Sequence, residues 1–197
     1  ARVFRISFTG ELSYEVNIQA DYAMGVLEAI VEAGKAYNLT PYGTETMHVL
    51  RAEKGFIIVG QDTDGSMTPD DLNMGWCVGR NKPFSWIGWR GMNREDCVRE
   101  ARKQLVGLKP VNPTQWLPEG AQLVFDPKQA IPMSMVGHVT SSYTCGSLGY
   151  SFAMGVVKDG LKRMGERVFA PLADGSVIEA EIVSSVFFDP KGERQNI

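Results

Sequence analysis

Among the side chains that could do chemistry, the sequence singles out Glu15. It follows Tyr14 in a predicted strand that comes directly after the polar turn at 9–13. Strict alternation along this strand places Glu15 and Asn17 on one face and Tyr14 and Val16 on the other. A carboxylate in this setting has two interpretations. It is either a solvated surface group, which propensity alone favours, or an acceptor for two parallel hydrogen bonds from the N–H pair of a heterocyclic ligand.

The other reactive side chains form no complete catalytic or metal-binding pattern. Asp62 and Asp64 lie in a glycine-rich loop, but a calcium-binding loop needs a longer series of oxygen ligands that closes on a glutamate. Ser141 has no Gly-x-Ser-x-Gly context, and no Cys or His pair has the spacing of zinc ligands. We therefore expect no metal site, and we expect His48 and His138 to have structural roles.

The first half of the chain predicts a mixture of strands and helices. Alternating segments predict two strands, at 2–8 and 14–18, of which the first is expected to bury one face. Three segments predict helices, at 21–36, 44–53 and 93–104. Asp21 is expected to cap the first helix, and Gly55 to end the second in a left-handed conformation. Arg51, Glu53 and Lys54 are expected to be exposed charges or local ion pairs.

From residue 105 onward the pattern changes to short strands. Turns rich in Pro, Gly and Asp separate six β-rich segments, at 105–108, 121–125, 133–140, 152–157, 167–170 and 177–183. This spacing, without long helices between the strands, is typical of a small antiparallel barrel or sandwich. The expected fold class is therefore α+β, with a mixed domain at 1–100 followed by a small antiparallel β-barrel at 101–197.

The composition is that of an ordinary globular protein. The 197 residues include 20 basic and 23 acidic side chains, for a formal net charge of −3. This balance argues against nucleic acid or an anionic membrane as the main partner, and no apolar run is long enough to span a bilayer. Three widely spaced cysteines suit a reducing compartment, so a cytoplasmic location is expected.

The start of the chain leads directly into the first predicted strand. Ala1 precedes it, and no upstream strand is available to pair with its backbone groups. We therefore expect the chain to be part of a longer polypeptide or a processed subunit.

Six segments carry motifs in a fixed order along the chain. They are FTGELSYEV at 8–16, MHVLRAEKGFIIVGQDTDG at 47–65, TP at 68–69, KPFSWIG at 82–88, GHVTS through AMG at 137–155, and FDPKGER at 188–194. In this order they resemble the glycine-cleavage T-protein (aminomethyltransferase) family, and the resemblance covers nearly the whole chain. The branch that fits best is the α subunit of heterotetrameric sarcosine oxidases, mainly through the second and last segments.

The resemblance implies a folate-binding domain at 1–100, present only as its C-terminal portion, followed by the aminomethyltransferase-type barrel at 101–197. The pterin-contacting glutamate of the family falls on Glu15, with Tyr14 beside it in the same folate-binding site. The family's catalytic aspartate is expected upstream of Ala1, so no catalytic residue is assigned here. Met47 replaces a folate-contacting arginine of the transferases, which disfavours aminomethyl transfer, and Arg51 is assigned a structural role.

The implied function is that of a tetrahydrofolate-binding module of sarcosine oxidase. It would accept, as methylene-tetrahydrofolate, the one-carbon unit released by oxidative demethylation of sarcosine. FAD, FMN and NAD are expected only in other domains or subunits, and the sequence has no Gly-x-Gly-x-x-Gly fingerprint. The other sarcosine oxidase subunits are the expected partners, and this chain alone is expected to be inactive. Two alternatives stay open: a fragment of a glycine-cleavage-type aminomethyltransferase, and a non-catalytic folate-binding or scaffold module.

Overall fold

The computed structural model describes residues 1–196, which cluster into two compact units. Unit 1 consists of Ala1–Phe56 together with the C-terminal segment that begins at Phe188, and unit 2 consists of Ile57–Phe187. These units are defined by contacts between residues. The predicted family domains, at 1–100 and 101–197, are defined by the resemblance to the family, and this second division stays a prediction.

Unit 1 begins with a short β-hairpin. Strands β1 (Arg2–Phe4) and β2 (Glu15–Asn17) pair antiparallel, with Val3 opposite Val16. Both strands are shorter than predicted, and all of their residues are exposed. The buried face expected for the first strand is therefore not found, because nothing in the described part of unit 1 covers the hairpin.

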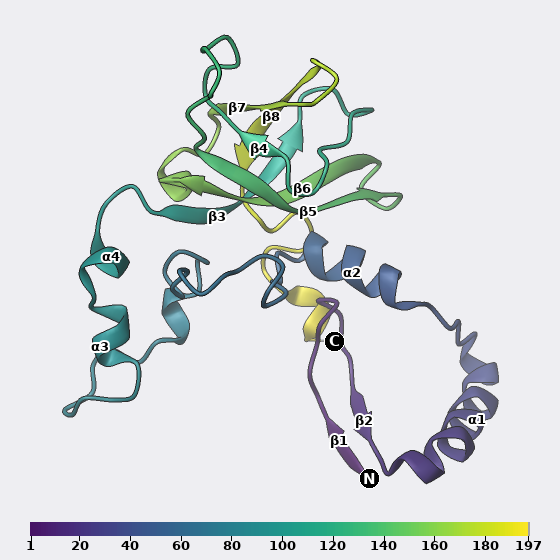
Figure 1. Cartoon of the computed structure of the whole chain (residues 1–197). Coiled ribbons are helices and arrows are strands. Elements are labelled where there is room, and N and C mark those ends of the chain that lie inside the picture. The colour runs from purple at the N-terminus through teal and green to yellow at the C-terminus, as the bar shows by residue number, and fades with distance from the viewer. Residues whose placement is uncertain (197) are drawn as a thin grey trace. The chain divides into compact units, whose positions relative to one another are not determined.

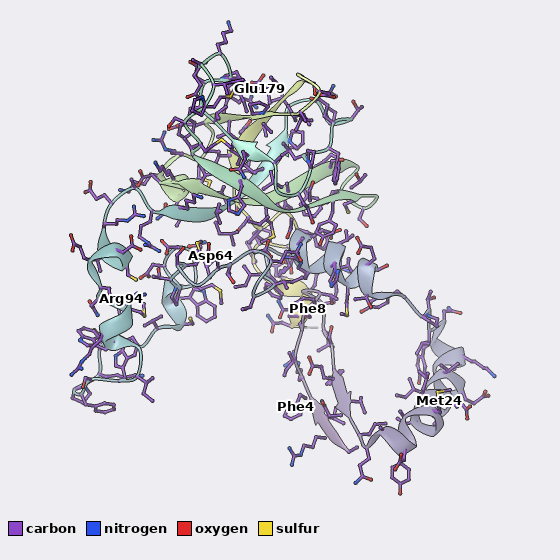
Figure 2. The ribbon with its side chains drawn as sticks, in the orientation of Figure 1. Phe4, Phe8, Met24, Asp64, Arg94 and Glu179 are labelled. Atoms are coloured by element: carbon purple, nitrogen blue, oxygen red, sulfur yellow. The ribbon has the colours of Figure 1, made fainter. Side chains whose placement is uncertain are left out.

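The first helix of unit 1 is α1 (Ala23–Gly34), between the 3-10 turns η1 (Ala20–Tyr22) and η2 (Lys35–Tyr37). The predicted N-cap is wrong: Asp21 lies inside η1, and no side chain caps α1. Apolar residues of α1 stay exposed, for example Met24 at 65% (Figure 2). The helix predicted from the spacing of the apolar residues is therefore confirmed. No residue described in unit 1 buries the apolar side chains of this helix.

Helix α2 (Thr44–Glu53) has the predicted bounds. Gly55 adopts φ of +72°, and its N–H donates to the Ala52 carbonyl oxygen at 3.0 Å, which confirms the left-handed helix end. The C-terminal segment, with η5 (Glu193–Gln195), docks there: Lys54 Nζ lies 2.8 Å from Asp189 Oδ2. The end of α2 thus holds the last residues of the described chain.

We expect Asp189→Asn to loosen this docking at neutral pH. The hydrogen bond from Lys54 lowers the pKa of Asp189 from its ordinary value of 3.8, because it favours the charged carboxylate. The stability gained this way is present above that value and is lost as the pH falls through the lower folded-state pKa. The Phe188 amide, which donates to the Glu53 carbonyl oxygen at 3.0 Å, reports the docking by hydrogen exchange. Protection that is equal in both proteins at neutral pH would contradict this role.

Unit 2 is built on a six-stranded antiparallel sheet with the strand order β4-β5-β6-β3-β8-β7. The strands are β3 (Lys103–Pro110), β4 (Gln122–Leu123), β5 (Gly137–Cys145), β6 (Tyr150–Lys158), β7 (Arg167–Pro171) and β8 (Val177–Val183). Val124 and Phe169 exchange two backbone hydrogen bonds of 2.9 Å and so join the two edges of the sheet. The result is the nearly closed antiparallel barrel that the strand spacing predicted (Figure 1).

The barrel encloses the hydrophobic core of unit 2. The core residues are Val106, Leu108, Leu117, Leu123, Val139, Ala153, Val157, Val168, Ala170, Ile178, Ala180 and Ile182. In β8 the buried residues alternate with partly exposed ones, as expected for a strand with one face on a core. The predicted α+β fold class is confirmed.

Short helical turns connect the start of unit 2 with the barrel. They are η3 (Gly75–Cys77), α3 (Trp89–Met92) and α4 (Glu95–Val98). The helix predicted at 93–104 is wrong beyond Val98, because Leu105 and its neighbours pair with β6 instead. Among residues 1–196 we find no helix with the length and apolar character that crossing a bilayer requires.

Candidate functional site

The predicted folate-binding residues lie on β2 in unit 1. Glu15 pairs with Phe4 of β1, and its side chain is exposed. Within residues 1–196 the Glu15 carboxylate takes part in no hydrogen bond or ion pair. Tyr14 is 60% exposed beside it. Both polar groups are therefore available to a ligand, and their assignment to folate stays a prediction.

A polar hollow of about 230 Å³ lies at the turn that leads into β2. It is lined by Arg5, Ser7, Glu11, Leu12, Ser13, Gln195 and Asn196. Glu15 and Tyr14 are not among these lining residues. The volume is below the roughly 300 Å³ at which small-molecule sites begin, so the hollow by itself does not hold a complete folate.

The C-terminal segment fixes the shape of this turn. Arg5 Nη2 donates to the Gln195 carbonyl oxygen at 2.6 Å, and Arg194 Nε lies 2.6 Å from Glu11 Oε1. Gly10 adopts φ of +83°, and a Cβ on it would lie 2.7 Å from Lys54 carbons. The sequence shows a polar turn here, but partners more than 180 positions away leave no local signal.

The charged residues at the end of α2 are buried rather than exposed. Arg51 is 0% exposed, Glu53 4% and Lys54 7%. Arg51 Nη1 donates to the Phe56 carbonyl oxygen at 3.1 Å, which fits the structural role expected for it. The expectation of exposed charges fails because the C-terminal segment docks on the end of this helix.

The two loop aspartates of unit 2 have different surroundings. Asp62 is 1% exposed and accepts hydrogen bonds of 2.6 Å from the hydroxyls of Thr140 and Ser141. A β-bulge between Val139 and Ser141 allows these two successive residues to reach the same carboxylate. Asp64 is exposed and accepts from Ser66.

Asp62 therefore anchors its loop to β5, and Ser141 serves as a donor in this anchor. No cluster of three or more His, Cys, Asp or Glu suited to a metal ion occurs among the 196 residues described.

The two histidines lie in separate units. His48 Nδ1 is 3.6 Å from Glu45 Oε2 on the same helix, a contact that becomes an ion pair only when His48 is protonated. His138 is half-buried on β5. Burial lowers the pKa of His138, and the nearby charge of Lys103 lowers it further.

The comparisons with known proteins agree with this architecture. Residues 1–82 match the GCVT N-terminal domain, and residues 103–189 match the glycine cleavage T-protein C-terminal barrel domain. The chain thus belongs to the glycine cleavage T-protein family.

Within this family the chain resembles α subunits of sarcosine oxidase, as its motifs predicted. It is 48% identical over 198 residues to the sarcosine oxidase subunit alpha of Corynebacterium sp. (strain U-96), a match that covers 100% of this chain and 20% of that protein. The subunit alpha of Rhizobium meliloti (strain 1021) is 36% identical over 196 residues, covering 99% of this chain and 20% of that protein. The chain therefore spans about one fifth of the length of these relatives.

A solved structure shares the fold. The glycine cleavage system aminomethyltransferase T from Bartonella henselae matches with a TM-score of 0.74 and 25% identity, over 94% of this chain and 49% of that one. The predicted aminomethyltransferase-like architecture is confirmed.

Proposed function

We propose that this chain forms part of the tetrahydrofolate-binding region of a sarcosine-oxidising enzyme. The observation that carries the proposal is the 48% identity over the entire chain to a sarcosine oxidase α subunit. On this proposal the other subunits of such an enzyme are its partners, and the location is cytoplasmic.

Glu15 is proposed to orient the pterin ring. An ionised carboxylate can accept two parallel N–H hydrogen bonds from the pterin's amidine-like edge, and charge-assisted pairs of this kind are both strong and directional. Glu15 suits this role because its carboxylate is exposed and has no partner within residues 1–196. Tyr14 adds an exposed ring for contact with the flat ligand.

The proposed reaction joins the two substrates of the enzyme. Oxidation of sarcosine gives an imine, whose carbon is attacked by an amine of the folate, and glycine leaves as methylene-tetrahydrofolate forms. FAD, FMN and NAD, which serve the oxidation, are assigned to other domains or subunits. This chain contributes orientation, which raises the effective concentration of the folate amine at the imine carbon.

A calorimetric titration with tetrahydrofolate tests the role of Glu15. The protein is used together with any subunits that copurify with it. We expect Glu15→Gln to weaken binding about tenfold to a hundredfold, because a hydrogen bond to a charged group contributes about 1.5–3 kcal/mol. The matched control is Glu28→Gln, which neutralises an exposed glutamate on α1 in the same unit and should leave the affinity unchanged.

Three other outcomes decide between the alternatives. If the unmodified protein does not bind folate, the proposal fails and a non-catalytic scaffold function is favoured. If the Glu15→Gln and unmodified proteins bind folate with equal affinity, Glu15 of β2 is not part of the folate site. Aminomethyl transfer from a lipoyl protein would favour a transferase, an activity against which Met47 counts.

A further inference from the structure

Two lysines face each other across neighbouring strands of the barrel in unit 2. Lys103 of β3 pairs directly with Lys158 of β6. Like charges directly opposite each other in an antiparallel pair are destabilising. Both lysines are exposed, and neither forms an ion pair within the part of the chain that the structure describes. The strand register therefore holds two positive charges together, without an ion-paired carboxylate on either lysine within the described residues.

A histidine joins the lysines on the same face of the sheet. His138 of β5 pairs with Val156, which lies two residues before Lys158 on β6. Directly paired residues share a face of the sheet, as do residues two apart in a strand. The core residue Val157 lies on the other face. Lys103, Lys158 and His138 consequently project from the outer surface of the barrel.

These three side chains line one hollow, with a volume of about 190 Å³. Asp64 contributes to its wall. Figure 2 shows this residue on the loop that precedes the short helical turns. A hollow of this size accommodates a single oxyanion group and is too small for a whole nucleotide or cofactor.

Among the charged residues in the wall of the hollow, the arginines have ion-pair partners and the lysines have none among residues 1–196. Arg102 Nη2 lies 2.6 Å from Asp71 Oδ2, and Arg99 Nε lies 2.7 Å from Asp96 Oδ1, so both arginines have counter-ions. Hydrogen bonds from Ser66 lower the pKa of Asp64 and keep it anionic. One carboxylate therefore faces two lysines, which leaves a positive excess in a chain whose net charge is −3.

We propose that this hollow binds an oxyanion, the phosphate or carboxylate group of a small molecule, through Lys103, Lys158 and an N–H of His138. The two ammonium groups supply the charge, and the imidazole supplies a directional donor. The buried Val156 also lines the hollow and makes part of its wall apolar, where water competes less for the anion. The site lies wholly within unit 2 and does not depend on the proposed folate function.

Lysine acylation of the intact chain, read by mass spectrometry, tests this proposal. Inorganic phosphate and succinate are compared with sodium chloride at equal ionic strength. At an anion concentration tenfold above its dissociation constant, mass action slows acylation of Lys103 and Lys158 about tenfold. Lys128 and Lys162, which are exposed elsewhere in unit 2, should react at an unchanged rate. Protection by phosphate alone identifies a phosphate group, and protection by succinate alone identifies a carboxylate.

Variants and the histidine signals provide a second measurement. Lys103→Gln should abolish the protection of Lys158 while slightly raising the melting temperature without anion, because the like-charge pair is removed. The chain has two histidines, so their imidazole NMR signals can be followed separately. A bound anion should raise the pKa of His138 and leave the imidazole signals of His48 where they are without the anion. Equal protection by chloride, protection at the control lysines, or no protection by either anion would overturn the proposal.

Discussion

Gly137→Ala is expected to prevent the barrel of unit 2 from folding with native stability. A Cβ on Gly137 would lie 2.0 Å from the Val156 carbonyl oxygen and 3.0 Å from the Val157 Cα. Both atoms belong to the backbone of β6, which is hydrogen-bonded to β5 and β3 and cannot move aside alone. We expect a loss of about 4 kcal/mol or more, at the upper end for single substitutions.

Urea unfolding followed by circular dichroism measures this loss. The matched control is Gly146→Ala, in the turn that joins β5 to β6, where a Cβ has no neighbour within 4 Å. That substitution should change the free energy of unfolding by no more than about 0.5 kcal/mol. If Gly137→Ala unfolds at the same urea concentration as its control, the close approach of β5 and β6 is not as described.

Arg102→Met is expected to destabilise unit 2 by about 3–5 kcal/mol, because it leaves a buried carboxylate without its cation. Arg102 is 9% exposed and Asp71 3%. Arg102 Nε donates to both oxygens of Asp71 at 2.9 and 3.0 Å, and Asp71 Oδ2 also accepts from Thr68 N–H at 2.8 Å. The Asp71 carbonyl oxygen in turn accepts from Leu105 N–H at 2.7 Å, so this pair anchors the segment before the barrel to β3.

A control variant and a double variant distinguish the cost of leaving the Asp71 carboxylate buried and unpaired from the cost of simply removing an arginine. Arg99→Met removes an exposed arginine paired with Asp96 and should change the free energy of unfolding by less than about 1 kcal/mol. Arg102→Met combined with Asp71→Leu should be less destabilised than Arg102→Met alone, since no unpaired charge stays buried. Equal losses in Arg102→Met and Arg99→Met would show that the buried pair contributes no more than a surface pair.

Local patterns predicted the elements whose signals lie within a few residues. Helix α2 was predicted with its bounds at Thr44 and Glu53, and Gly55 was predicted to end it, because capping depends on adjacent residues. Strand β8 at Val177–Val183 was predicted without error, because alternation over seven residues is a strong signal. The motif order also predicted the T-protein family and its sarcosine oxidase branch, which the comparisons confirm.

Predictions failed where distant partners compete with local preference. The charged run around Arg99 has helical spacing, yet the chain leaves the helix after Val98 because strand pairing with β6 buries Leu105. Arg51 is a charged helix residue by sequence, but it is fully buried in unit 1. The region of the candidate folate site shows the same limit. Alternation along the sequence predicts that Glu15 lies in a strand, which is β2. The hollow at the preceding turn is also lined by Gln195, and no local pattern predicts a contribution from so distant a residue.

The sequence by itself determined the kind of most of the main elements, the α+β class and the family, because periodicity, turn residues and motif order are encoded along the chain. The tertiary structure alone decided which charges are buried, which strands close the barrel, and that Lys103 lies opposite Lys158. The physical reason is register. A one-residue shift in the pairing of β3 with β6 would turn every side chain of one strand to the other face of the sheet, and this choice rests on the packing of the whole core rather than on neighbours in sequence.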